Sequence, residues 1–241
     1  MRVSPPESRR RGRRRGDRLL IPLLCVLPLA ALGVTGPGQD PSEGPRKVDP
    51  YTIVGPRHYL DGYPASRGSG TAYVVVEIPT GTTAKWEVDK RDGALRWEIE
   101  NGVPRVVQYL GYPGNYGMVP RTVLPEELGG DGDPLDVLAL GPPAEQGDVV
   151  LARVVGVLKL SDGGEQDDKL IAVVEGTAFA EVRDLPALRR RFPGVTEIVE
   201  TWFTSYKGPG RMESRGWGDA REAHDVLEAA KREYERTRAS W

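Results

Sequence analysis

The sequence predicts a β-rich α+β domain with helices towards its C-terminus, and two observations support this. Between residues 71 and 174, short apolar runs alternate with turns rich in Gly, Pro or acidic residues, a pattern typical of a barrel or a sandwich. In the last third, apolar residues recur at helical spacing instead. The chain has 241 residues, 39% of them hydrophobic, which is enough for one fair-sized core.

The predicted strands follow one another along the middle of the chain. The β-branched run 71–78 is the first. In the second, residues 85–89, a period of two places three charged residues on one face and Trp86 and Val88 on the other. Further strands are expected at residues 95–99, 106–110, 136–140, 149–160 and 170–174. Residues 112–120, which include two tyrosines, are expected to form a turn region with packed aromatic rings.

Two helices are predicted from apolar residues three and four positions apart. One contains Ile198, Val199, Trp202, Phe203 and Tyr206, and the other Ala223, Val226, Leu227, Ala230 and Tyr234. Asp184 and Asp219 stand where helix N-caps are expected. The chain has no internal repeat, so these helices are expected to pack on a single β-rich domain.

Charge and cysteine content exclude several classes of function. The net charge is -2, but residues 1–36 hold eight Arg against two acidic residues, so residues 37–241 carry -8. This acidic body disfavours a nucleic-acid binder, which needs Lys and Arg to neutralise phosphates. The single Cys25 excludes an intrachain disulfide framework and a cysteine-rich zinc site. Two histidines leave little room for histidine-based chemistry.

Residues 1–36 predict an export signal. A cluster of arginines precedes the apolar run 19–32 and then small residues, which is typical of a secretory signal peptide. The run is shorter than the ~20 apolar residues of a spanning helix, so a membrane anchor through residues 19–34 is the alternative if the segment stays uncleaved. A misassigned start codon would instead imply a cytoplasmic protein. Residues 37–57, rich in Pro, Gly and charge, are predicted to link this segment to a domain over residues 58–241.

The strongest chemical signal is the segment Asp131-Gly132-Asp133-Pro134-Leu135-Asp136, with three carboxylates in six residues. Three such anions repel one another unless cations neutralise them. Oxygen ligands of this kind suit magnesium or calcium. An EF-hand loop is excluded, because Asp136 and Pro142 would stand where that loop needs Gly and Glu. A solvated acidic turn is the alternative interpretation.

A second charged cluster, Asp162 to Lys169, precedes the predicted strand 170–174. At the strand entry Asp167 and Lys169 share a face, so a carboxylate and an ammonium group could meet the same metal–anion complex. A charged hairpin loop is the alternative here. The pair Tyr206-Lys207 closes the first predicted helix and adds a further hydroxyl and cation.

Taken together, these segments resemble the family I soluble inorganic pyrophosphatases, from about Val74 to the C-terminal helix. The shared segments occur in family order: Glu77-Ile78-Pro79, Lys85-Trp86-Glu87, Tyr112-Pro113 with Asn115-Tyr116-Gly117, Asp131 to Val137, Asp162 to Lys169, and Tyr206-Lys207. The resemblance implies a five-stranded OB-like barrel with flanking helices, magnesium-dependent hydrolysis of pyrophosphate to two phosphates, and a homo-oligomer.

The resemblance also implies a role for each site residue. Asp133 matches the residue that accepts a proton from the attacking water. The metal ligands are matched by Asp131, Asp136, Asp162 and Asp167. The groups that hold phosphate oxygens are matched by Lys85, Arg105, Tyr116, Lys169, Tyr206 and Lys207, and Glu77 and Glu87 complete the polar wall.

These roles agree with what the residues can do chemically. An acidic pocket repels pyrophosphate, so bound Mg²⁺ must first invert the sign of the site. Two cations that bridge one water lower its pKa, while Lys and Arg stabilise charge on the phosphate oxygens. The sequence departs from the family pattern at Gly163, where members commonly have Glu, and Arg105 aligns only across a one-residue gap. The number of bound metal ions is therefore open. The alternative that the domain binds a divalent cation or phosphate without catalysing a reaction is also open.

Overall fold

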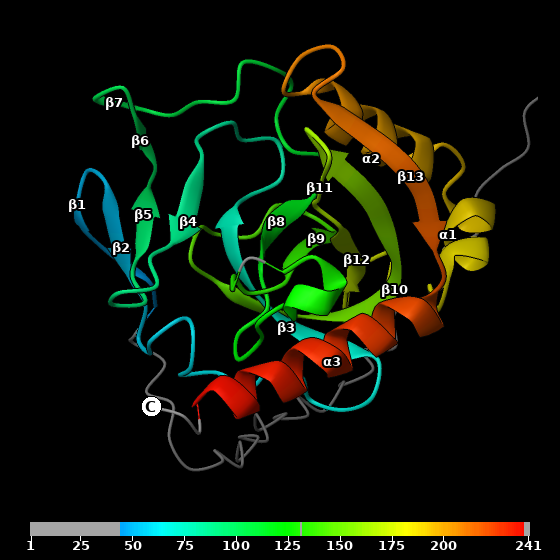
Figure 1. Ribbon diagram of the computed structural model, residues 1–241, viewed down its shortest axis with the longest axis horizontal. Helices are drawn as coiled ribbons and strands as arrows, with labels where there is room; N and C mark the ends of the chain where they lie inside the picture. The colour runs from blue at the N-terminus through cyan, green and yellow to red at the C-terminus, as the bar shows by residue number, and fades with distance from the viewer. Residues whose placement is uncertain (1–43, 131, 239–241) are drawn as a thin grey trace, which may run out of the picture. The chain divides into compact units, whose positions relative to one another are not determined.

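Five strands form a ring of hydrogen-bonded pairs at the centre of the fold (Figure 1). The computed structural model describes residues 44–130 and 132–238. In ring order the strands are β3 (Thr71–Ile78), β8 (Asn115–Met118), β9 (Asp136–Leu140), β12 (Lys169–Val174) and β10 (Val149–Asp162), and β10 pairs back to β3. Only the β9–β12 pair among these is parallel. The fold is therefore β-rich, as the sequence predicts.

The ring depends on β10, which is 14 residues long and pairs with several partners. Its first half pairs with β3, while its second half pairs with β11 (Glu165–Gln166) and β13 (Met212–Gly218). The pairing with β12 shifts register between Val154 and Gly156. A Cβ at Gly156 would press on the Leu185 side chain at 2.7 Å, so a glycine here lets a helix pack against the strand.

Two apolar layers lie on opposite faces of the ring strands, and the period of two in β9 separates them. Val137 and Ala139 belong to a core shared with α3 (Ala220–Arg238). Leu138 and Leu140 belong to a core shared with α1 (Leu185–Arg191) and α2 (Val195–Ser205). Figure 1 shows α3 running alongside β10 and α2 beside β13.

The helix predictions are confirmed. The residues predicted for the first helix lie in α2, except Tyr206 at its C-terminal end, and those predicted for the second lie in α3. Asp184 caps α1 by accepting a hydrogen bond from the Ala187 N–H at 2.7 Å, and Asp219 accepts one from the Glu222 N–H at 2.9 Å. A short 3-10 turn, η1 (Glu126–Leu128), is the remaining described helix. No helix in the described residues is long and apolar enough to cross a membrane.

A second, smaller sheet corrects part of the linker prediction. Its order is β1 (Arg46–Asp49), β2 (Thr52–Val54), β5 (Leu95–Trp97) and β4 (Trp86–Val88). Residues 46–54 fall in the stretch 37–57 that the sequence predicts as a linker, but Ile53 is buried against Trp86 and Leu95. The β-branched run Thr52-Ile53-Val54 carries enough apolar area to add a strand pair to this sheet.

Two further segments differ from the sequence prediction. Residues 106–110 form no strand and contribute only an isolated bridge between Val106 and Ala84. Residues 95–99 divide between β5 and β6 (Ile99–Glu100), which forms a hairpin with β7 (Val103–Pro104). Asn101 and Gly102 form its two-residue turn with φ angles of 53° and 80°, the positive values that such tight turns require.

Candidate active site

One cavity of about 780 Å³ gathers most of the predicted site residues. It lies between the small sheet, the strands β3, β8 and β9, and the end of α2. The predicted residues that line it are Glu77, Lys85, Glu87, Arg105, Tyr116, Asp133, Asp136, Asp167, Tyr206 and Lys207. Lys169 and Asp162 are joined to this lining by ion pairs, and Asp131 lies outside the described residues. Residues separated by more than a hundred positions therefore meet in one place.

Lys169 is the most deeply placed cation of the site, with only 3% of its side chain exposed. It begins β12, whose parallel partner β9 begins at Asp136. Its Nζ lies 2.5 Å from Asp136 Oδ2 and 2.5 Å from Asp167 Oδ1. Burial opposes the charge on Lys169, but the two carboxylates outweigh burial and raise the pKa of Lys169 above its usual value. The prediction that Asp167 and Lys169 share a face is confirmed.

Asp136 stays ionised although only 34% of its side chain is exposed. Burial acts to raise its pKa, but the neighbouring Lys169 ammonium, with Lys85 and a hydrogen bond from Tyr116, brings the pKa of Asp136 below its ordinary value. An ionised carboxylate that lines a cavity is a strong ligand for a hard cation.

The pKa of Glu77 shifts in the opposite direction to that of Asp136. Glu77 is 5% exposed at the end of β3, and burial raises its pKa to about 8, although Lys85 opposes the shift. Its Oε1 accepts a hydrogen bond from the Val88 N–H at 2.7 Å, which ties β3 to β4. The site therefore holds a protonated carboxyl group and ionised ones side by side at neutral pH.

Tyrosine hydroxyls supply neutral donors along one wall. The rings of Tyr112 and Tyr116 lie 5.1 Å apart, and Lys85 Nζ lies 5.7 Å from the centre of the Tyr116 ring. Burial raises the pKa of Tyr116 well above its usual value, so this hydroxyl keeps its proton. Tyr206 stacks on Trp202 with ring centres 4.6 Å apart, which holds it at the end of α2.

Backbone hydrogen bonds join Lys85 and Arg105 both directly and by way of Glu98. The Lys85 N–H donates to the Arg105 carbonyl at 3.0 Å, the Glu98 N–H to the Lys85 carbonyl at 2.9 Å, and the Arg105 N–H to the Glu98 carbonyl at 2.8 Å. Arg105 Nη1 also contacts both Glu98 carboxylate oxygens, at 2.7 and 2.9 Å. Arg105, which aligns with the family arginine only across a one-residue gap, therefore lies in the cavity wall.

Sequence reasoning missed several charged residues of the cavity: Asp89, Lys90, Arg91, Arg96, Glu98 and Asp168. The period of two in residues 85–89 was the available signal, because Asp89 shares the face of Lys85 and Glu87. Lys90 forms an ion pair with Asp133, and its Nζ lies 3.4 Å from the Gly132 carbonyl oxygen. Nothing in the local sequence at Lys90 indicates that partner, which follows 43 positions later.

The donor set fits a hard divalent cation. Each described carboxylate predicted as a metal ligand is held by an ammonium group: Asp136 and Asp167 by Lys169, and Asp162 by Lys207 at 2.6 Å. The other oxygen of Asp162, Oδ1, is buried without a hydrogen-bond partner. Within the described residues, no three Asp, Glu, His or Cys side chains form a ready-made metal site. These carboxylates are thus neutralised by lysines and still have oxygen lone pairs to offer.

Comparison with known proteins agrees with this geometry. Residues 74–235 match the family profile described as inorganic pyrophosphatase. This chain belongs to the inorganic pyrophosphatase family. It is therefore placed among the enzymes that hydrolyse a phosphoanhydride bond. The matched range contains every described residue that was predicted for the site.

Several curated inorganic pyrophosphatases resemble the chain. The one from Haemophilus ducreyi is 36% identical over 187 residues, which cover 72% of this chain and 97% of that protein. The one from Ralstonia nicotianae is 36% identical over 162 residues, 64% of this chain and 85% of that protein. The mitochondrial inorganic pyrophosphatase of Saccharomyces cerevisiae is 34% identical over 158 residues, and the chain spans about half of its length.

Solved structures of inorganic pyrophosphatases share the fold. The type I enzyme from Toxoplasma gondii superposes with a TM-score of 0.71 at 26% identity, covering 77% of this chain and 93% of that one. The enzyme from Helicobacter pylori superposes with a TM-score of 0.62 at 32% identity, covering 73% and 99%.

Proposed function

We propose that this chain hydrolyses inorganic pyrophosphate to two phosphates, with magnesium as its cofactor. One observation carries the proposal: a single cavity brings carboxylates for cations together with Lys, Arg and Tyr side chains for phosphate oxygens. A multiply charged anion can enter such a cavity only when bound cations offset its carboxylates. The oxygen-only donor set favours magnesium over zinc.

The site residues have different roles according to their charge. Asp131, Asp136, Asp162 and Asp167 would hold magnesium, which when bound lowers the pKa of water and draws charge from phosphate oxygens. Lys85, Arg105, Lys207, Tyr116 and Tyr206 would bind the phosphate oxygens, where their donors stabilise the charge that develops during transfer. Lys169 keeps Asp136 ionised in the metal-free state and forms an ion pair with Asp167.

The chemical step needs no protein nucleophile. A water oxygen forms a bond to one phosphorus while the bond from that phosphorus to the bridging oxygen breaks, and the electron pair leaves with the second phosphate. Asp133, which lines the cavity at the entry to β9, accepts the proton of the attacking water. We further propose that the five-strand ring is an OB-like barrel, the architecture that the family resemblance implies.

The test is phosphate release from pyrophosphate by wild-type protein and by the Asp133→Asn variant. Wild-type turnover should need magnesium and stop with chelator, and the variant should lose on the order of 10²- to 10⁴-fold in kcat. Asp225→Asn, an exposed aspartate on α3, is the matched control and should keep full activity. Protein that binds magnesium but releases no phosphate would overturn the proposal and favour the non-catalytic module that Gly163 leaves open.

We also propose that the protein is exported, on the strength of residues 1–36, which lie outside the described residues. Arginines followed by a short apolar run are what an export signal requires. Fusion of residues 1–36 to a reporter that is active only outside the cytoplasm tests this. Reporter activity is expected, and it should fall when residues 9–15 lose their arginines. A reporter that stays inactive would favour the cytoplasmic alternative.

A further inference from the structure

A second cavity, of about 400 Å³, adjoins the active-site cavity described above. Lys90 and Pro134 line both spaces, whereas Gly132 lines only the second of the two. Asp133, between Gly132 and Pro134, lines the active-site cavity but not the second cavity. The segment 132–134 therefore forms part of the wall between them, and it carries the proton acceptor of the proposed reaction.

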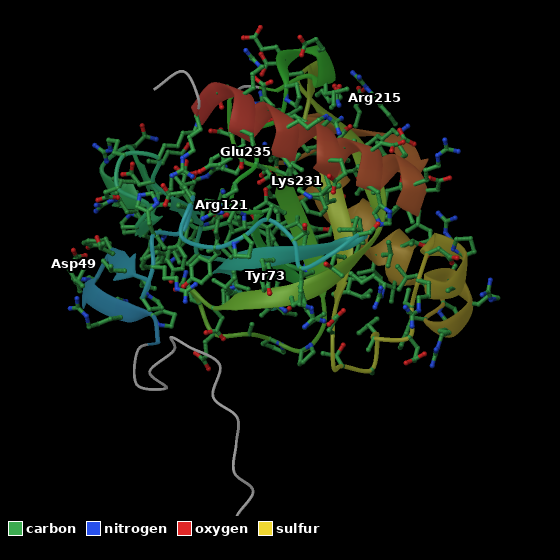
Figure 2. All side chains as sticks on the ribbon, turned by 90° about the horizontal axis from the view of Figure 1, so that it is seen from below. Asp49, Tyr73, Arg121, Arg215, Lys231 and Glu235 are labelled. Atoms are coloured by element: carbon green, nitrogen blue, oxygen red, sulfur yellow. The ribbon has the colours of Figure 1, made fainter. Side chains whose placement is uncertain are left out.

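The other walls of the second cavity come from the turn 58–61, residues 122–123 and the last turns of α3. Figure 2 shows Arg121 beside the last turns of α3, which carry Glu235. The Val123 N–H donates to the Ala230 carbonyl at 3.1 Å, which ties this segment to α3. The cavity is therefore enclosed by parts of the chain that are bonded to one another.

Apolar side chains supply one part of this lining: Leu60, Val123, Pro134 and Tyr234. Each of them is half-buried, so each keeps apolar surface in contact with water. A ligand with an apolar body removes such surface from water, which is the main source of affinity in small-molecule sites of this size. A planar ring suits a wall that contains proline and tyrosine rings.

Most charged side chains of this lining already have partners. Lys90 forms an ion pair with Asp133, and His58 Nδ1 lies 3.0 Å from Asp61 Oδ1. A ligand anion gains little from Lys90, because Asp133 offsets that charge. The Asp61 carboxylate repels an anion from its own end of the cavity. The position of a charged ligand group therefore depends on the one remaining charge.

That remaining charge is Arg238, which forms no ion pair with any residue that the structure describes. Its Nη1 donates to the Tyr234 hydroxyl at 3.4 Å, and its guanidinium lies 5.9 Å from the centre of the Tyr234 ring. A guanidinium has five N–H donors in a planar fork that matches a carboxylate. The second cavity thus offers one unpaired cation beside apolar walls.

We propose that the second cavity binds an aromatic monocarboxylate and that this ligand slows turnover. The carboxylate pairs with Arg238, and the ring packs against Pro134 and Tyr234. Because Pro134 directly follows Asp133, a ring packed there displaces the proton acceptor from the attacking water, and small displacements of this kind greatly slow a reaction. The residues assigned to phosphate oxygens do not line the second cavity, so substrate binding is unaffected. The kinetic part of this inference rests on the proposed function, whereas the binding part does not.

Binding is measured by isothermal titration calorimetry of the full-length protein with phenylacetate and with phenylacetamide, which has the same ring without the charge. Phenylacetate should bind, and phenylacetamide should bind about tenfold more weakly or worse, because it lacks the ion pair. Arg238→Ala should weaken phenylacetate binding by a similar factor. Arg232→Ala is the matched control, because Arg232 is exposed on α3 and lines neither cavity.

The same compound is then added during pyrophosphate hydrolysis at fixed free magnesium. Saturating phenylacetate should lower kcat about threefold or more and leave KM within about twofold. Arg238→Ala should keep the wild-type kcat without phenylacetate, which shows that the variant is folded, and should lose the inhibition. Arg232→Ala should be inhibited as the wild type is.

The outcomes separate the two proposals. Wild-type protein that takes up no phenylacetate overturns the assignment of the second cavity, and so does equal weakening of binding in Arg238→Ala and Arg232→Ala. A rise in KM at constant kcat would place phenylacetate in the active-site cavity and overturn the inference as well. Binding without any change in kcat contradicts the coupling to Asp133. Wild-type protein that releases no phosphate contradicts the proposed function, and the calorimetry then still decides whether the second cavity binds.

Discussion

Lys169 stands at the centre of the site as a buried cation between two carboxylates. Its replacement by Met would leave Asp136 and Asp167, which are 34% and 29% exposed, without this neutralising charge, which costs about 1–3 kcal/mol of unfolding free energy. Urea denaturation measures this loss, and magnesium should recover part of it by binding the freed carboxylates. The matched control is Lys231→Met, whose exposed pair with Glu228 should contribute at most about 1 kcal/mol. Equal losses in the two variants would contradict the role of Lys169.

Glu77 makes stability depend on pH in a predictable direction. Its pKa is about 8 in the fold and 4.5 in a free side chain, so the folded state binds the extra proton between these values. Stability is therefore full at low pH and falls as pH rises through this window, by at most about 1.4 kcal/mol per pH unit from this group. In metal-free protein, Glu77→Gln should remove this slope, measured by denaturant unfolding at several pH values. Glu87→Gln, at an exposed position, should keep it.

The sequence allowed the acidic site residues to be predicted but not all of their partners. Asp133 and Asp136 are recognisable because carboxylates so close in sequence need cations. Lys90, in contrast, has the sequence context of an ordinary surface residue in a turn, and only the approach of the small sheet to the entry of β9 makes it a partner of Asp133. Contacts of this kind depend on tertiary packing, which no local pattern encodes.

Among the strands, β8 shows why the sequence predicts a turn where the structure has a strand. Its sequence, Asn115-Tyr116-Gly117-Met118, has a glycine in the middle and lacks β-branched residues, so propensity disfavours it. The strand nevertheless lies between β3 and β9 in the ring. Residues 46–54 form strands where the sequence predicts a linker. The apolar run that pairs with β5 is short and has polar neighbours, so no strand pattern stands out there.

Close packing of β8 on β3 requires the glycine. A Cβ at Gly117 would overlap the Val75 carbonyl oxygen. Gly117→Ala should therefore lower the unfolding free energy by about 1–3 kcal/mol, because the two strands must move apart. Urea denaturation measures the change. Gly68→Ala serves as the control, since a Cβ there meets nothing within 4 Å, and a similar loss in both variants would contradict the steric explanation.

At the scale of the whole molecule, the surface carries exposed apolar side chains on α2 and on the segment beside it, where the Leu110 carbonyl accepts a hydrogen bond from Trp202 Nε1. Leu110 is 71% exposed and Ile198 is 61% exposed. Exposed apolar groups of this size favour self-association, in line with the homo-oligomer implied by the family resemblance. Sedimentation should show a species larger than 26.4 kDa, and replacement of both residues by Ser should shift it towards the monomer. A monomer at every concentration would contradict this prediction.

The pairing of β10 with both β3 and β12 has a consequence for biosynthesis. The ring closes only when residues 149–153 meet residues 71–75, a pairing between segments far apart in the chain. Closing so long a loop is slow, and β3 has no partner from β10 until the ribosome has made that strand. A leader at residues 1–36 would leave the ribosome well before this. The strand ring of the nascent chain has then not yet closed when such a leader emerges from the ribosome. An unfolded chain is what passage through a membrane pore requires.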